Sequence, residues 1–318
     1  MSVTAHRHRD SPRVRRLARE HGVDLDRIRP SGRHGRATAA DVRASVASAD
    51  PEVAAPVVAA RVVAAPAGSV SAGSVPVRVE RLSRRRKVIA ERMHRSLLES
   101  AQLTTVVEAD LTQVSTVRAA VKDEFHSRYG VSLSVLAFVA EAAVRALVDH
   151  PVINARLDLA AGTVTYPSSV GLGIAVDTEE GLVVPVIRGA DDLNVGALAR
   201  RIADLAARAR SGTAAADDFS GGTFTITNTG SRGALFDTPI LNAPESAILG
   251  LGTVVRRPVV LRGGDGEELI AIRSMAYLAL TYDHRLVDGA DAARYLASVK
   301  ERLENPARSW EDSVGVAR

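Results

Sequence analysis

The chain has 318 residues, and 46% of them are hydrophobic, which is enough to bury the core of one large domain or of two smaller ones. It contains no cysteine, so disulfide scaffolds, zinc ribbons, iron–sulfur centres and thiol nucleophiles are excluded. We expect a protein of the reducing cytoplasm, with no metal site.

The formal net charge of +4 is concentrated at one end of the chain. Residues 1–50 contain eleven arginines against six acidic residues, so the rest of the chain is close to neutral. Aromatic residues make up only 3%, too few for the stacking platforms that hold single-stranded nucleic acid. The basic segment therefore favours a partner protein with an acidic surface, and nucleic-acid binding is the less favoured alternative.

No membrane segment or signal peptide is expected. Residues 1–10 are polar, which is not typical of a secretory signal. The most apolar stretch, residues 53–67, contains Pro56, Arg61 and Pro66 and is shorter than the roughly 20 residues that a membrane-spanning helix needs.

The first fifty residues predict two short helices. Val14 and Ala18 fall on one face of the first helix, which Gly22 stops. Thr38 followed three residues later by Asp41 is typical of the start of the second helix. A domain this small has a very small core, so we expect it to act through surface contacts.

Composition divides the chain into a two-helix domain at residues 10–48, an Ala/Pro/Val/Ser linker at 49–76, and a catalytic domain at 77–318. In the third part strands alternate with helices, which predicts one α/β domain. The expected strands are at residues 77–82, 103–111, 163–166, 170–176, 182–187, 222–228, 246–255 and 274–283. The expected helices are at residues 83–98, 111–125, 133–148, 195–209 and 290–303.

His284 lies where catalytic side chains are commonly found. An apolar strand over residues 275–282 ends just before it, and Asp288 opens the next helix. An imidazole there can act as a general base that takes a proton from a thiol or hydroxyl attacking a carbonyl. The plainer alternatives are a structural histidine and, at Asp288, a carboxylate that only favours the helix N-terminus.

A strand bounded by glycines, at residues 221–230, supplies the second candidate. Alternation places Phe224 and Ile226 on one face and Thr225 and Thr227 on the other. The hydroxyl of Thr227 can donate a hydrogen bond to a developing oxyanion. Because threonine favours strands, an ordinary polar face is the alternative interpretation.

Several segments together resemble one known family. The segment Asp283–Gly289 matches the pattern D-H-R-x-x-D-G, and residues 222–228 read G-T-F-T-I-T-N. Further matches are at residues 173–177, 181–187, 238–240 and 243–245. In this order they resemble the dihydrolipoamide acyltransferase family of the 2-oxo acid dehydrogenase complexes, over nearly the whole chain from Ser11 to Leu303.

The resemblance implies an α/β fold with the mixed sheet of the chloramphenicol acetyltransferase type, preceded by a small all-α peripheral subunit-binding domain. It also implies a homotrimer, with or without further assembly into a cage, and an active site between subunits. By this resemblance, His284 of one subunit is the general base, Thr227 of its neighbour is the oxyanion donor and Asp288 is an orienting carboxylate. Thr227 stands where the family more often has serine, and both offer a hydroxyl. The residues then expected to bind substrate or coenzyme A are Asn228, Gly230, Arg285 and Gly289.

The first domain resembles the peripheral subunit-binding domain, which holds a partner dehydrogenase component through basic residues. Ala37 takes the place of the usual apolar residue, so we expect a thinner core and weakened partner binding. The candidate partner-binding residues are Arg13, Arg16, Arg33 and Arg36.

Complex-forming members of the family carry a lipoyl group on a hairpin lysine of a separate domain. The lysines of this chain, Lys87, Lys122 and Lys300, all fall in helical patterns, so no covalent lipoyl group is expected on it. We therefore expect an enzyme that takes an acyl group, such as acetyl, from coenzyme A and O-acetylates a small-molecule hydroxyl. A tetronate of polyketide antibiotic biosynthesis is the favoured acceptor.

Two other functions stay open. The first is a dihydrolipoamide acyltransferase component of a 2-oxo acid dehydrogenase complex, truncated or served by a lipoyl domain in trans. The second is a scaffold that keeps the fold but no longer catalyses.

Overall fold

The computed structural model describes residues 11–25, 28, 30–32, 36–47, 77–263, 266–306 and 309–315. The chain forms two compact units, Met1–Arg78 and Val79–Arg318, and each has a hydrophobic core of its own. The predicted linker, residues 49–76, lies outside the described residues.

The small unit contains the two predicted helices, α1 (Pro12–Glu20) and α2 (Ala39–Ala47). Ala37 is only 7% exposed, so alanine does fill its place in the core. The buried residues that pack between the helices are Val14, Ala18, Ala37 and Val42.

Asp41 fixes the start of α2. Its carboxylate accepts hydrogen bonds from the hydroxyl (2.6 Å) and backbone N–H (3.0 Å) of Ser31 and from the N–H of Thr38 (2.8 Å). These bonds, those of Ser31 first, hold the pKa of Asp41 well below its ordinary value. The predicted Thr38–Asp41 pair is therefore a helix cap that also anchors the preceding loop.

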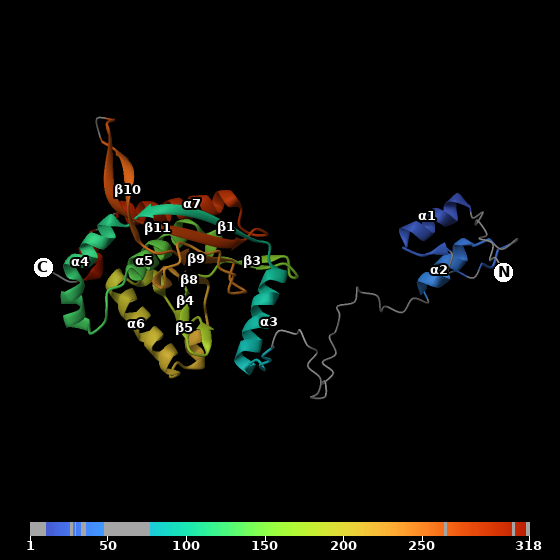
Figure 1. The fold of residues 1–318 in the computed structure, drawn as a ribbon, viewed down its shortest axis with the longest axis horizontal. Helices are drawn as coiled ribbons and strands as arrows, with labels where there is room; N and C mark the ends of the chain where they lie inside the picture. Colours follow the sequence, from blue (N-terminus) through green and yellow to red (C-terminus); the bar gives the residue numbers. More distant parts are fainter. Residues whose placement is uncertain are drawn as a thin grey trace. The chain divides into compact units, whose positions relative to one another are not determined.

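The large unit is built on a seven-stranded mixed sheet, shown in Figure 1. The strand order is β1-β11-β9-β8-β4-β7, with β10 paired to β11. Strand β8 is parallel to both of its neighbours, β4 and β9, whereas the other pairs are antiparallel. The strands are β1 (Gln102–Asp110), β4 (Leu172–Ile174), β7 (Val186–Ile187), β8 (Phe224–Asn228), β9 (Ala247–Leu251), β10 (Val255–Arg262) and β11 (Glu268–Asp283).

Helices cover the face of the sheet to which Phe224 and Ile226 point. Tyr295 of α7 packs edge-on against Phe224, with ring centroids 5.9 Å apart, and its hydroxyl donates to the Ala143 carbonyl of α5 at 3.2 Å. The apolar sequence of α5 is explained by burial on nearly all sides. Helix α3 (Arg84–Glu99) lies apart from this layer and contacts the loop before β9. The other helices of the large unit are α4 (Thr112–Tyr129), α5 (Val135–Asp149), α6 (Val195–Ser211), α7 (Gly289–Glu304) and α8 (Trp310–Val314).

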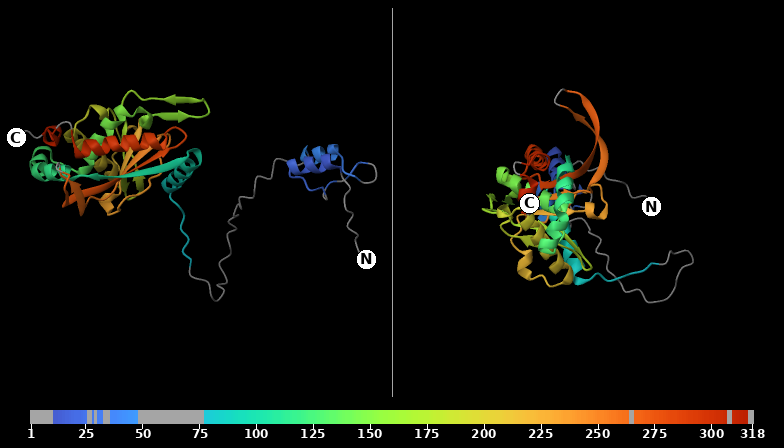
Figure 2. Two further views of the ribbon diagram at one scale, coloured as in Figure 1. Left: turned by 90° about the horizontal axis from the view of Figure 1, so that it is seen from above. Right: turned by 90° about the vertical axis from the view of Figure 1, so that its left-hand side faces the viewer.

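Strand β11 begins six residues earlier than the predicted strand at 274–283, and with β10 it forms a long hairpin that projects from the body (Figures 1 and 2). Exposed apolar side chains along the projecting part include Val260, Ile270 and Ile272. From Arg256 to Arg262 the residues of β10 alternate between exposed and partly buried, so the two faces of the hairpin differ in exposure.

Two of the predicted strands are divided by turns. Residues 170–187 form β4 and β7 of the sheet and a separate small hairpin of β5 (Val176–Thr178) and β6 (Gly181–Val183). Strand β3 (Thr163–Thr165) pairs with β2 (Arg156–Asp158). The predicted strand at 77–82 is wrong: these residues are exposed and have no regular structure, because no neighbouring strand pairs with them. Among the described residues, no helix is both long and apolar enough to cross a membrane.

Candidate active site

His284 follows the last residue of β11, as the sequence predicts. Its backbone N–H donates to the carbonyl of Ala101 at 2.8 Å, and its ring lies 5.9 Å from that of the buried Tyr282. The imidazole itself is 44% exposed. The backbone of His284 is therefore fixed, while its ring is accessible.

Asp288, the predicted orienting carboxylate, lies close to His284. Its Oδ1 is 3.8 Å from Nδ1 of His284, within ion-pair distance but beyond hydrogen bonding, and its side chain is 79% exposed. It also occupies the N-cap position of α7, where Asp291 accepts a 3.4 Å hydrogen bond from its backbone N–H. A carboxylate so placed can orient a charged imidazolium and favours the N-terminus of the helix.

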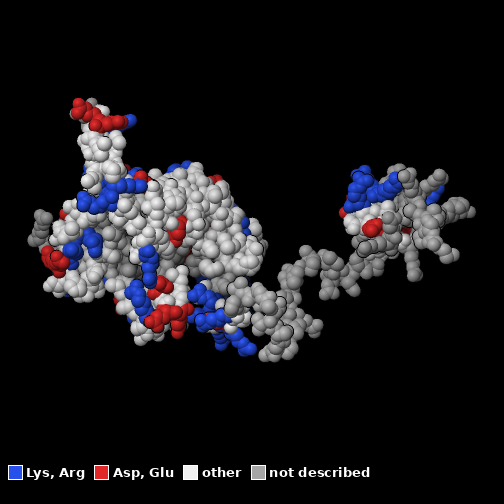
Figure 3. Space-filling view, in the orientation of Figure 1, with Lys and Arg blue, Asp and Glu red and all other residues white. Residues whose placement is uncertain are grey.

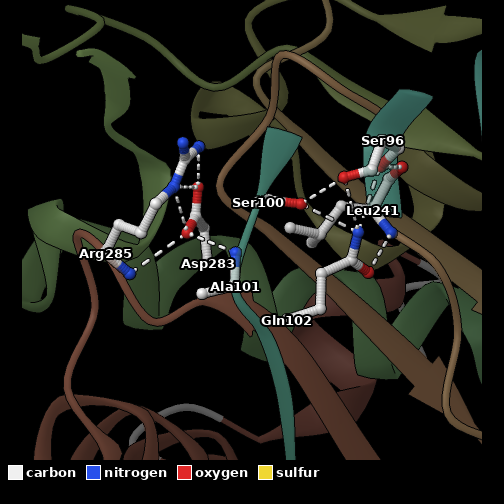
Figure 4. A network of polar contacts seen from close by, with 7 residues as sticks. All are labelled: Ser96, Ser100, Ala101, Gln102, Leu241, Asp283 and Arg285. Carbon is white, nitrogen blue, oxygen red and sulfur yellow. Dashed lines mark hydrogen bonds and ion pairs between the residues drawn. The ribbon is translucent and has the colours of Figure 1, made fainter. Parts of the chain in front are cut away.

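Asp283 and Arg285, on either side of His284 in the chain, form a paired network (Figure 4). Arg285 Nη2 lies 2.6 Å from Asp283 Oδ2, and the backbone N–H groups of Arg285 and Ala101 donate to Oδ1 at 3.1 and 3.3 Å. Burial opposes ionisation of Asp283, but the bonds from Arg285 and Ala101 outweigh it and lower its pKa. Arg285, predicted to bind substrate, is thus engaged with Asp283.

A second group of polar contacts, also in Figure 4, ties α3 and β1 to the loop before β9. Ser96 Oγ donates to the Leu241 carbonyl at 2.7 Å, and the Leu241 N–H donates to Gln102 Oε1 at 3.0 Å. Gln102 also donates to Ser96 Oγ at 3.1 Å. Sequence reasoning missed these residues, because partners so far apart in the chain leave no local pattern.

Thr227 lies on β8, half-buried, on the face opposite to α5 and α7. It is paired with Gly250 of β9, and Gly250 is paired with Ala279 of β11, so these three residues form one row across the sheet. His284 lies five residues beyond Ala279 along β11.

This register separates Thr227 and His284 within one chain. Five residues of strand span about 17 Å, and two strand spacings add about 10 Å at right angles, so their Cα atoms lie about 20 Å apart. A hydrogen-bonded reaction intermediate requires its donors within about 3 Å. One copy of the chain therefore does not bring the imidazole and the Thr227 hydroxyl to a single reacting carbonyl.

A buried carboxyl that the sequence analysis did not single out packs against the same face of β8. It belongs to Glu245, in the loop before β9. Glu245 is 6% exposed, and its Oε2 accepts a 2.6 Å hydrogen bond from Thr225 Oγ1. Asn242 Nδ2 donates to Oε1 at 2.7 Å. Burial raises the pKa of Glu245 to about 7. The interpretation of Thr225 as an ordinary polar strand residue is wrong, because its hydroxyl is buried in this pair.

A second carboxyl lies near Thr227. A Cβ atom added at Gly250, the strand partner of Thr227, would be 2.8 Å from Asp237 Oδ1. Partial burial raises the pKa of Asp237. A side chain at position 250 would force this carboxyl to move.

The remaining predicted substrate-binding residues have identifiable structural contacts. Asn228 Oδ1 accepts a 3.1 Å hydrogen bond from the Ser231 N–H and so shapes the turn after β8. A Cβ at Gly230 would lie 2.2 Å from the backbone carbon of Gly252, so glycine is required there. At Gly289 the nearest atom would be Tyr282 Oη at 3.5 Å, an ordinary contact.

Three of the predicted partner-binding arginines are described. Arg13 and Arg36 are exposed, and Arg16 forms an exposed ion pair with Glu20 at 2.9 Å. Figure 3 shows basic side chains along one face of the small unit. Arg33 lies outside the described residues. No group of three or more His, Asp or Glu side chains in the described part of the chain is arranged to hold a metal ion.

The match to known families covers both units. The family model for the catalytic domain of 2-oxoacid dehydrogenase acyltransferases matches residues 75–310, well over half of the chain. The chain belongs to this family. The model for the e3 binding domain matches residues 11–43 in the small unit. The predicted family is confirmed, and the matching model is that of an acyltransferase catalytic domain.

Three relatives show what the chain is similar to. It is 49% identical, over 311 residues, to the dihydrolipoyllysine-residue acetyltransferase component of the pyruvate dehydrogenase complex of Mycobacterium tuberculosis, covering 96% of the chain and 56% of that protein. Identity to the Corynebacterium glutamicum acetyltransferase component is 46%, covering 92% of the chain and 43% of that protein. The succinyltransferase component of the Escherichia coli 2-oxoglutarate dehydrogenase complex is 39% identical, and the match covers 94% of this chain and 71% of that protein. The chain spans about half the length of the first two.

Solved structures give the same fold. The cubic core of the pyruvate dehydrogenase multienzyme complex matches with a TM-score of 0.69 and 35% identity, covering 76% of this chain and 97% of that one. The Azotobacter vinelandii dihydrolipoamide acetyltransferase matches with a TM-score of 0.68 and 35% identity, and the match covers 72% of this chain and 92% of that chain. The predicted α/β fold with a small N-terminal helical domain is confirmed.

The relatives overturn one prediction. O-acetylation of a tetronate in antibiotic biosynthesis is wrong as the favoured function, because the relatives at 46–49% identity are acetyltransferase components of pyruvate dehydrogenase complexes. The inference rested on the lack of a hairpin lysine. Lys87, Lys122 and Lys300 do lie in α3, α4 and α7. That lack says nothing about the acceptor, since in this family the lipoyl group is carried by a separate domain.

Proposed function

We propose that the chain is the catalytic and subunit-binding part of a dihydrolipoamide acetyltransferase of a pyruvate dehydrogenase complex. The observation that carries the proposal is the accessible imidazole of His284, held at the end of β11 by the Asp283–Arg285 pair and followed four residues later by Asp288. Acetyl is favoured over succinyl because the acetyltransferase relatives are 46–49% identical and the succinyltransferase relatives 37–39%.

The Azotobacter vinelandii enzyme supports the roles assigned to these residues. Its structure was solved to investigate a serine, a histidine and an asparagine in its catalytic mechanism, and that histidine and asparagine are four positions apart. His284 and Asp288 have the same spacing, and Thr227 offers the hydroxyl of a serine.

In the proposed reaction the neutral imidazole of His284 removes the proton from the thiol of coenzyme A. The sulfur then attacks the carbonyl carbon of an acetyl thioester on dihydrolipoamide, and the carbonyl oxygen becomes an oxyanion. The intermediate collapses by breaking the bond to the dihydrolipoamide sulfur, which takes the proton back from the imidazolium. Asp288, at 3.8 Å, favours the charged ring through its carboxylate.

Thr227 acts on the oxyanion. Its hydroxyl donates a hydrogen bond that strengthens as negative charge develops on the carbonyl oxygen, and removing one such donor costs about 10² to 10³ in rate. A β-strand in the middle of the sheet is a rigid support for such a donor.

The separation of about 20 Å between Thr227 and His284 in one chain favours a site shared between copies, because two strand spacings and five residues of strand lie between them. We propose a trimer in which His284 of one subunit faces Thr227 of its neighbour. The 44% exposure of the imidazole is consistent with a surface that a second copy covers.

The small unit is proposed to bind a partner dehydrogenase component. Its match to the e3 binding domain and its exposed Arg13 and Arg36 support this role. Arginine on such a surface suits an acidic partner, and the affinity should fall with salt.

The test of the proposed function is an acyl-transfer assay of the purified chain. Acetyl-CoA is supplied with dihydrolipoamide in one reaction and with a small alcohol in another, and succinyl-CoA replaces acetyl-CoA in a third. We expect acetyl transfer to dihydrolipoamide that requires His284. Absence of turnover with dihydrolipoamide in a correctly folded trimer would contradict the proposal.

A further inference from the structure

We infer that Glu245 is a positioning residue for the hydroxyl of Thr227, acting through Thr225 and strand β8. This inference rests on the proposed role of Thr227. It gives Glu245 a role in the reaction in addition to the roles of His284, Asp288 and Thr227. Glu245 is buried, 6% exposed, and its two carboxyl oxygens have different partners.

The first contact joins Glu245 to the catalytic strand. Thr225 Oγ1 donates to Glu245 Oε2 at 2.6 Å, and Thr225 is two residues before Thr227 on the same face of β8. The hydrogen bond at Thr225 therefore holds β8 in place relative to Glu245, two residues before Thr227.

The surrounding backbone leaves room for this pair. A Cβ atom added at Gly173, which is paired with Thr225 on the neighbouring strand β4, would lie 2.6 Å from Thr225 Oγ1. A Cβ added at Gly222 would lie 2.8 Å from Glu245 Oε1. A side chain at either glycine would therefore displace one member of the Thr225–Glu245 pair.

The second contact joins Glu245 to its own loop. Asn242 Nδ2 donates to Glu245 Oε1 at 2.7 Å, and the Glu245 N–H donates to the Asn242 carbonyl at 3.2 Å. The loop is in turn held from α3 and β1, where Ser96 donates to the Leu241 carbonyl and Gln102 accepts from the Leu241 N–H. Hydrogen bonds from α3 and β1 therefore hold the loop at residues 241–245 in place, and Glu245 connects this loop to β8 through Thr225.

The same segment reaches the strand that carries His284. The N–H of Asp283 donates to the carbonyl of Ser246 at 2.9 Å, one residue after Glu245. Segment 241–246 thus contacts both strands that carry proposed catalytic groups. The bond at Ser246 is between backbone groups, so truncating the Glu245 side chain leaves it in place and acts on β8 through Thr225.

The charges that face Glu245 are cationic. It lies at the wall of a cavity of about 370 Å³, which three arginines line, from α3 and β2. Arg92 and Arg156 favour its ionised form, whereas burial favours its neutral form. Arg92 also donates to the Ala243 carbonyl at 3.2 Å, and Arg85 is paired with Glu180. Either protonation state of Glu245 keeps a bond to Thr225, since a carboxylate accepts from the hydroxyl and a carboxylic acid donates to it.

The test compares Glu245→Ala and Thr225→Val with Glu245→Gln and Thr225→Ser, in acetyl transfer to dihydrolipoamide by the full chain. We expect kcat to fall about 10- to 100-fold in the first pair, with KM within about 2-fold, because the loss acts on the transition state. The second pair keeps hydrogen-bonding groups at both positions and should retain most of kcat. Glu180→Gln, which removes an exposed carboxylate beside the same cavity, is the matched control and should behave as wild type.

A double-mutant cycle with Thr227→Ala distinguishes positioning from general stability. If Glu245 acts through Thr227, then Glu245→Ala should lower kcat strongly in the wild type and by less than about 2-fold in the Thr227→Ala background. Equal losses in both backgrounds, or wild-type kcat in folded Glu245→Ala, would overturn the inference while leaving Thr227 in its role. Wild-type kcat in Thr227→Ala would overturn the proposed role of Thr227 and this inference with it. Where Glu245→Ala does not fold, Thr225→Val enters the same cycle.

Discussion

Asp283 and Arg285, the residues immediately before and after His284, form an ion pair in which Arg285 Nη2 lies 2.6 Å from Asp283 Oδ2. The Asp283 carboxylate also accepts from the Ala101 N–H, and the Ala101 carbonyl accepts from the His284 N–H. The end of β11 and the residue before β1 are thus joined by a closed set of hydrogen bonds. This set fixes the backbone of His284, while Asp288 at 3.8 Å contributes only through charge.

Replacing Asp283 by Asn should destabilise the protein in a pH-dependent way. The pKa of Asp283 is lowered in the folded state, so the ionised carboxylate stabilises it at neutral pH and this stabilisation is lost as the pH falls through the folded pKa. We expect a loss of about 1–3 kcal/mol at pH 7, since a largely buried charge network is broken. Urea unfolding at pH 7 and at pH 3 checks this, and an equal loss at both values would contradict it.

Replacing His284 by Ala or Asn should lower kcat for acetyl transfer by about 10² to 10⁴, the usual contribution of a general base. Asp288→Asn should have a smaller effect, because its carboxylate lies 3.8 Å from the ring and is 79% exposed. The measurement is kcat with acetyl-CoA and dihydrolipoamide, alongside circular dichroism to confirm folding. A His284→Asn enzyme with wild-type kcat would exclude His284 as the base.

Glu245 should make the large unit less stable as the pH rises. Its folded pKa of about 7 lies above its ordinary value of 4.5, so the folded state holds a proton that the unfolded chain releases between these values. The stability lost between about pH 4.5 and pH 7 is on the order of 3 kcal/mol, at 1.36 kcal/mol for each unit of pKa. Glu245→Gln removes this titration, so its unfolding free energy should fall less than that of the wild type between pH 5 and pH 8. Parallel slopes for the two proteins would show that Glu245 does not titrate in this range.

The sequence was sufficient where the signal is local. Alternation along β8 placed Phe224 and Ile226 in the core and Thr227 on the opposite face, and helical periodicity located α5 and α7. It failed where a partner distant in the chain decides the structure. Residues 77–82 alternate like a strand but have no strand to pair with, so their backbone stays irregular.

The candidate site divides in the same way. His284 and Asp288 stand in a short motif at a strand end, so the sequence alone locates them. Glu245 depends on Thr225, 20 residues earlier, and on two glycines that leave space for their side chains. Glu245 lies in one of the matched segments, residues 243–245, but the match does not reveal its burial, because burial is a property of the assembled sheet and loop.

The two glycines predicted to bind substrate should respond differently to alanine. At Gly230 a Cβ would lie 2.2 Å from the backbone carbon of Gly252, and its three nearest atoms are all backbone atoms of Gly252 and Thr253, so no flexible side chain can move away. We expect Gly230→Ala to lose several kcal/mol of stability or to fail to fold. At Gly289 the nearest atom is Tyr282 Oη at 3.5 Å, so Gly289→Ala should stay within about 0.5 kcal/mol of the wild type. Thermal unfolding of the two variants makes the comparison, and a Gly230→Ala protein as stable as Gly289→Ala would contradict it.

Mixed assemblies should test whether His284 and Thr227 act across subunits. In one chain these residues are about 20 Å apart, because five residues of β11 and two strand spacings lie between them. A His284→Ala chain retains Thr227, and a Thr227→Ala chain retains His284, so a pair of unlike neighbours rebuilds one intact site. Random mixing in trimers gives His284 on one side and Thr227 on the other in about one quarter of the sites, one half multiplied by one half.

Co-expression of the two chains with different affinity tags, followed by purification through both tags, isolates the mixed trimers. We expect an acetyl-transfer kcat well above that of either variant alone, near the fraction of rebuilt sites in the purified mixture. If each active site were formed within one chain, every site would lack one of the two groups, because no chain carries both. The mixed trimers would then show only the average of the two variants, and the shared site would be excluded.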